Sequence, residues 1–139
     1  MSKKQSCLLA LPLMIGCLST HAMPPKPASC PKVSSIKAGG LGYSDLSNDG
    51  YVVLQLSQYG TKDTWVFGFS SIKATSKSEA LDIGNKALAT LSGSPIPLPV
   101  PSEDVWACLY QTSQGYTGIA FTPVNLSIKL NSSIMQAIR

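Results

Sequence analysis

The sequence has little of what enzymes and metal proteins most often use. It contains one histidine, His21, and only 13% of its 139 residues are charged. Imidazole is a frequent general base and metal ligand, and His21 lies in a segment that we expect to be removed. The only adjacent carboxylates, Glu103 and Asp104, are predicted to lie in a solvated loop. The chain is therefore predicted to be no enzyme and to hold no metal, with a hydrolase that works without histidine as the remaining alternative.

The sequence also lacks an apolar run of the roughly 20 residues that a membrane-spanning helix needs. Its apolar residues 7–18 follow two lysines and precede small residues that end at Ala22. This order is typical of an export signal, so we expect residues 1–22 to be removed and the mature protein to be periplasmic or secreted. The alternative is an envelope-associated structural protein or a lipoprotein lipidated at Cys17, because residues 14–17 resemble the box that precedes the lipidated cysteine of bacterial lipoproteins.

The sequence also carries no large excess of charge of one sign. The formal net charge is +4, and it falls to +2 when Lys3 and Lys4 leave with the export signal. This excess is too small to favour nucleic acid or an anionic membrane surface. The expected partner is therefore a small apolar ligand or another protein.

Cysteine is scarce, and its distribution is informative. Removal of residues 1–22 leaves Cys30 and Cys108 as the only pair. In an oxidising compartment the simplest outcome is one disulfide between them. The bridge would close a long loop, for which the chain-entropy model gives roughly 4 kcal/mol.

The clearest pattern that is present runs from a strand into a helix. Trp65, Phe67 and Phe69 occupy every second position of the segment 65–72, which predicts a strand with these side chains on one face. Ser76 and Glu79 form a capping-box pattern at the start of the helix that follows. Its apolar stripe has spacings of three and four and is rich in small residues: Ala80, Ile83, Gly84, Ala87, Leu88 and Leu91. Gly93 is predicted to end this helix.

The remaining segments complete an α+β prediction. Strands are expected at 41–46 and 51–59, and a second hairpin pairs 105–111 with 116–122. Residues 32–38 suggest one helical turn, and the alternating prolines of 94–101 suggest an extended spacer. The prediction is an antiparallel sheet of four to five strands with one helix packed across a face, in a domain at 41–123. A Pro-rich lead-in at 23–40 precedes it, and a C-terminal tail at 124–139 follows, with a short amphipathic helix near 134–138.

Aromatic side chains are the main candidates for a binding site. Five are expected on the strands at 65–72 and 105–111, whose order in the sheet the pattern leaves open: Trp65, Phe67, Phe69, Trp106 and Tyr110. Some of them could line an apolar pocket, and packing in the core is the alternative. A haem would need an iron ligand, for which the chain offers a Cys30 thiolate, in conflict with the disulfide, or one of five tyrosines.

The same residues carry a resemblance. The run Trp65…Ile72-x-Ala74…Glu79-Ala80-Leu81…Gly84…Ala87-Leu88…Leu91-Ser92-Gly93-x-Pro95, with Cys30-Pro31 before it and Trp106-x-Cys108-x-Tyr110 after it, resembles a family of small exported bacterial proteins. Some members of that family carry the name hemin-binding protein. The resemblance implies an exported, two-cysteine, non-enzymatic protein of a host-associated Gram-negative bacterium with a haem-related role. It implies no particular binding residues.

Overall fold

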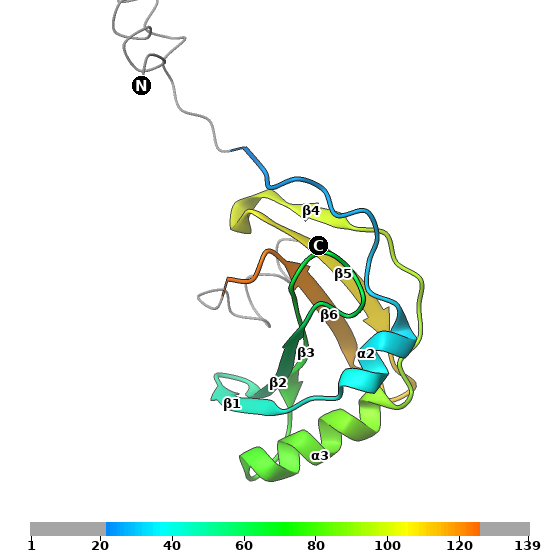
Figure 1. Cartoon of the computed structure of the whole chain (residues 1–139). Coiled ribbons are helices and arrows are strands. Elements are labelled where there is room, and N and C mark those ends of the chain that lie inside the picture. Colours follow the sequence, from blue (N-terminus) through cyan, green and yellow to red (C-terminus); the bar gives the residue numbers. More distant parts are fainter. Residues whose placement is uncertain (1–21, 126–139) are drawn as a thin grey trace, which may run out of the picture.

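The computed structural model describes residues 22–125 and is shown in Figure 1. The predicted export signal up to residue 21, the lipidation site at Cys17 and the amphipathic helix near 134–138 lie outside these residues. Within the described part of the chain, no helix is long and apolar enough to cross a membrane.

The structure is α+β and is built on one antiparallel sheet of six strands. The strands are β1 (Tyr43–Ser47), β2 (Gly50–Ser57), β3 (Trp65–Ile72), β4 (Leu98–Val100), β5 (Val105–Gln111) and β6 (Thr117–Thr122). Their order across the sheet is β1-β2-β3-β6-β5-β4, so the second hairpin joins the first through β6 and β3. The helices are α2 (Val33–Gly39) and α3 (Lys77–Leu88), and a 3-10 turn, η2 (Pro101–Glu103), precedes β5.

The predicted numbers of strands (four to five) and helices (one) were therefore too low. The strand that was missed is β4, within the alternating prolines. Pro99 has no N–H to donate, but a proline is tolerated in a strand at the edge of a sheet. β4 is such a strand, and it pairs with β5 through Leu98↔Ala107 and Val100↔Val105. The second helix is α2, where the sequence suggested a single helical turn at 32–38; it makes two turns and ends where Gly40 adopts a φ of 67°.

The capping prediction for α3 is confirmed at its start. The Ser76 hydroxyl accepts a hydrogen bond from the N–H of Glu79, and the Glu79 carboxylate accepts one from the N–H of Thr75. The first bond satisfies a donor that the first helical turn leaves free, and the second fixes the residue before the N-cap. The hydrogen bonds at Thr75 also hold the pKa of Glu79 below its usual value.

The predicted end of α3 at Gly93 was wrong, because the helix ends at Leu88. The Thr90 hydroxyl donates to the carbonyl of Ala87 and closes the last turn. Ser92 then exchanges two backbone hydrogen bonds with Gln111 of β5, at 2.8 and 3.0 Å, which requires extended backbone before Gly93 is reached. Pairing with the sheet therefore ends the helix several residues earlier than the sequence pattern suggested.

The two faces of the sheet carry separate apolar clusters. On the first, which we call the helix face, α2 and α3 contribute Ile36, Ala80, Ala87 and Leu88 to a core that includes Trp65, Phe67 and Phe69. The opposite side, which we call the second face, carries a cluster from the alternate strand positions: Val66, Val100, Val105, Ala107, Ile119 and Phe121. Both faces are therefore apolar, which is unusual for an antiparallel sheet with solvent on one side.

Candidate functional site

The disulfide joins the lead-in to the middle of β5. Cys30 and Cys108 are bonded with an S–S distance of 2.05 Å, which confirms the predicted pairing. Two further contacts reinforce it, because the Trp106 indole N–H donates to the Pro24 carbonyl and the Tyr110 hydroxyl donates to the Pro31 carbonyl. The lead-in is thus fastened to β5 at three points.

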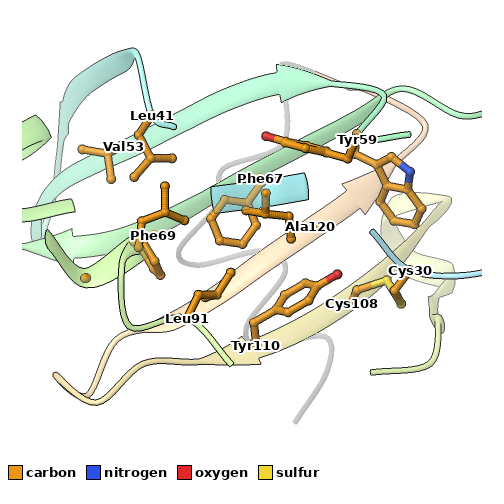
Figure 2. Close-up of a cluster of buried hydrophobic side chains, with 14 of the residues drawn as sticks. Cys30, Leu41, Val53, Tyr59, Phe67, Phe69, Leu91, Cys108, Tyr110 and Ala120 are labelled. Carbon is orange, nitrogen blue, oxygen red and sulfur yellow. A yellow bond between two sulfur atoms is a disulfide. The ribbon is translucent and has the colours of Figure 1, made fainter. Parts of the chain in front are cut away.

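Four of the five candidate pocket aromatics lie in the core. Trp65, Phe67, Phe69 and Tyr110 have no exposed surface, and the Phe67 ring makes edge-to-face contacts with the rings of Phe69 and Tyr110. Figure 2 shows Phe67, Phe69 and Tyr110 side by side on the helix face, with the disulfide next to Tyr110. Trp106 is partly exposed, and the ammonium of Lys26 lies 5.9 Å from its ring.

A shallow groove of about 380 Å³ lies elsewhere, between the lead-in and the segment before β4. Residues 28–34 and 93–97 line it, and none of the five aromatics contributes. In Figure 1 the lead-in, in blue, runs beside the yellow-green segment that leads to β4. The groove is open, and Ile96 on its rim is 70% exposed.

The tyrosines fall into two groups. Burial raises the pKa of Tyr59 to about 12 and raises that of Tyr110 as well, the latter also through the nearby Tyr59. The Tyr59 hydroxyl donates to the carbonyl of Gln55, so both buried phenols are protonated hydrogen-bond donors at neutral pH. Tyr43, by contrast, is 54% exposed. A phenolate ligand for iron is therefore sterically accessible at Tyr43, whereas Cys30 in its disulfide has no thiolate to offer.

The β1–β2 hairpin exposes most of the large apolar surface. Of the four exposed large apolar side chains within the described residues 22–125, Tyr43, Leu46 and Leu56 all lie on this hairpin, at 54%, 66% and 41% exposure. Tyr43 is on the second face opposite Leu54, its cross-strand partner. Leu46 is on the helix face, as is Ser44, which donates to the Lys77 carbonyl of α3. The hairpin therefore presents apolar side chains on both faces.

β1 is also the outermost strand, and no other strand within residues 22–125 pairs with its outer edge. A strand in that position presents a row of backbone N–H and C=O groups to any segment that can pair with it. The alternation of β2 favours burial of its leucines, so the sequence did not reveal that Leu56 is exposed. The segment 41–46 has only a weak strand pattern, which is compatible with an edge strand. That weak pattern is the one feature of the sequence from which this surface could have been predicted.

Asn85 is a second residue that the sequence pattern did not single out. Its side-chain oxygen accepts from the N–H of Leu41, and its side-chain nitrogen donates to the carbonyls of Leu41 and Leu81. These bonds fix the segment that leads into β1 against α3. Asn85 thereby positions the candidate hairpin.

In the structure from residue 22 to residue 125, no three histidine, cysteine or acidic side chains lie close enough to hold a metal ion. The comparisons with known proteins add one match. The family model described as Domain of unknown function (DUF4949) matches residues 29–132. No curated protein and no solved structure matches the chain.

Proposed function

The chain belongs to the DUF4949 family, and we propose that it is an exported, non-enzymatic interaction protein whose partner binds the β1–β2 hairpin. The observation that carries this proposal is the concentration of exposed apolar surface there, at Tyr43, Leu46 and Leu56. Large apolar side chains that gather at the surface of one element typically mark an interaction site. The outer edge of β1, with which no other strand of residues 22–125 pairs, lies beside Tyr43 and Leu46.

The chemistry of this surface favours an extended segment of a protein partner. A strand added to β1 would gain backbone hydrogen bonds along the edge, which are independent of its sequence. Tyr43 and Leu46 point to opposite faces, so apolar side chains at alternate positions of the partner would meet each of them. A partner with extended backbone and alternating apolar residues is therefore the class that fits.

Site-specific photocrosslinking in the cells that produce the protein tests this proposal. A crosslinking amino acid at position 43, 46 or 56 should trap the same partner from all three positions. The matched controls are the exposed helix positions Asp82 and Lys86 on α3, which should trap nothing in common with the hairpin. A partner trapped equally well from α3, or a different product from every hairpin position, would contradict a hairpin site.

Export is supported by the disulfide, because such bonds form and persist in oxidising compartments. The intact mass of the protein from its natural compartment, with and without reduction, tests this point. The expected mass is that of residues 23–139 less two hydrogens, with the two hydrogens regained on reduction. Two free thiols in the native protein would argue against export, and a mass increment from acyl chains on Cys17 would show the lipoprotein alternative.

Haem, or another flat apolar molecule, is the second candidate ligand, and Tyr43 is the observation that favours it. Its phenol is exposed at the end of an apolar surface formed by Leu54 and Leu56 on the second face. Such a surface could carry the porphyrin while the phenolate binds the iron. Titration of hemin into the mature protein should shift the Soret band, the shift should be lost in Tyr43→Phe, and it should persist in Tyr116→Phe. An unshifted band in the unmodified protein rules haem out.

A further inference from the structure

The second face carries an unbroken apolar row from β2 to β4. A single row of cross-strand partners runs through five strands, and it consists of Leu56, Val66, Phe121, Ala107 and Leu98. An antiparallel sheet that faces water normally alternates apolar and polar residues, with the polar ones outward. A row without any polar member indicates that this face is covered.

Exposure along the face shows where the cover lies. The side chains of Val66, Ala107 and Phe121 are 2% exposed or less, whereas Leu56 at the end of the row is 41% exposed. Helices α2 and α3 contribute to the cluster on the other face. Among residues 22–125, Val124 is the one member of the second-face cluster that does not belong to a strand. The cover therefore lies over β3, β6, β5 and β4, and it leaves the β1–β2 end open.

We propose that the C-terminal segment 126–139 of this chain binds over the second face and covers the cluster of Val66, Phe121 and their neighbours. The chain leaves β6 at Thr122, and β6 lies in the interior of the sheet between β3 and β5. Two residues later Val124 already packs against the second-face cluster. The remaining fourteen residues thus begin on the face that needs a cover.

The composition and length of this segment fit that role. Half of it is apolar, and the part Leu126-Ser127-Ile128-Lys129-Leu130 alternates strictly, which places its three apolar side chains on one side of an extended chain. The segment carries no acidic residue. Fourteen residues reach about 20 Å as a helix or about 45 Å extended. The covered strands, spaced about 4.8 Å apart, span less than either length. The family match extends to residue 132, so the alternating part belongs to the matched region.

Hydrogen exchange of the full chain, and of the form without residues 1–22, tests the proposal without any substitution. Amides of 126–132 should exchange at least about tenfold more slowly than in a free peptide of the same sequence, which corresponds to about 1.4 kcal/mol. Exchange at the free-peptide rate would overturn the proposal. Protection present only while residues 1–22 remain attached would also overturn it, because that segment would then be the cover.

A charge-matched pair of variants identifies the side of the segment that makes the contact. Ile128→Asp should abolish the protection and raise the fluorescence of the apolar dye ANS several-fold, whereas the neighbouring Ser127→Asp should change neither. An equal response from both variants would overturn the proposal. Sedimentation tests whether a second copy of the chain is the cover instead. If the wild-type protein is a dimer, and Ile128→Asp is still a dimer whose sheet amides remain protected, the proposal is refuted. None of these outcomes depends on Tyr43 or Leu46, so the hairpin proposal stands or falls separately.

Discussion

Replacing Gly84 with alanine has two opposing effects on stability, each of known size. Gly84 lies in the interior of α3, where alanine is favoured over glycine by about 1 kcal/mol. A Cβ at this position, however, would lie 2.7 Å from Cγ2 of Val53 and 3.1 Å from a methyl carbon of Leu41. Carbon atoms in van der Waals contact normally lie roughly 3.5 to 4.0 Å apart. The helix can therefore accept alanine only if Val53, or α3 as a whole, moves.

Movement of Val53 is difficult. Its side chain is fully buried on β2, and a β-branched residue has few alternative rotamers. Added volume in a packed core costs about 1 to 3 kcal/mol. The gain of about 1 kcal/mol in helix propensity offsets part of this packing cost. We therefore expect Gly84→Ala to lower the free energy of unfolding by up to about 2 kcal/mol.

Urea denaturation measures this change, and two variants serve as controls. Asp82→Ala, at an exposed position of the same helix, gains propensity without a packing cost and should stabilise the protein slightly. Val53→Ala removes the methyl group that clashes, so Gly84→Ala should be tolerated better in that background than in the wild type. If Gly84→Ala stabilises the wild-type protein by about 1 kcal/mol, the close approach of α3 to β2 does not limit this position, and the reasoning is refuted.

Three further outcomes are expected. Replacing Cys30 and Cys108 together with serine should lower the free energy of unfolding by up to about 4 kcal/mol, since the bridge spans a separation of 78 residues, and dithiothreitol should then no longer change the urea midpoint. Because the pKa of Tyr59 is about 12 in the folded protein and near 10 when unfolded, the unfolded chain loses this proton first. The contribution of Tyr59 to stability should therefore be fully present below pH 10 and be lost between pH 10 and 12. The urea midpoint should fall between pH 9 and pH 11, and this fall should be smaller in Tyr59→Phe. An equal fall in both proteins would contradict the assignment. Asn85→Ala should cost about 1 to 3 kcal/mol by thermal denaturation, because it leaves the N–H and carbonyl of Leu41 without their side-chain partner, whereas Asp82→Ala should not destabilise the protein.

Local patterns in the sequence predicted the central elements well. The alternation of Trp65, Phe67 and Phe69 reflects a period of two that only a strand satisfies, and β3 has the predicted bounds. The Ser76 cap is likewise a contact between residues three apart, so it depends on no tertiary information. The disulfide followed from the count of cysteines that would remain after the predicted removal of residues 1–22.

Elements that depend on distant partners could not be predicted in the same way. β4 exists because β5 supplies its hydrogen bonds, and nothing within Leu98–Val100 distinguishes such an edge strand from a spacer. The early end of α3 depends on the pairing of Ser92 with Gln111, nineteen positions further along the chain.

The candidate hairpin surface escaped prediction for the same reason. An exposed and a buried leucine look alike in an alternating strand, and the exposure of Leu56 follows from the place of β2 near the open end of the sheet. The burial of four aromatics in the core of the helix face was one of two alternatives that the alternation left open. Composition shows which side chains are available to bind, but the order of the strands decides which of them reach the surface.

The two edges of the sheet differ in a way that governs self-assembly. β4 contains Pro99 and is flanked by Pro97 and Pro101, so at these three positions the edge has no amide proton to offer an incoming strand. Strand addition is thereby confined to β1. Two molecules that met through β1 would form a closed pair related by a two-fold axis, since neither would keep a second edge with a full set of donors. The prolines at one side thus cap the sheet, so strand addition at the other side would not lead to open-ended polymerisation.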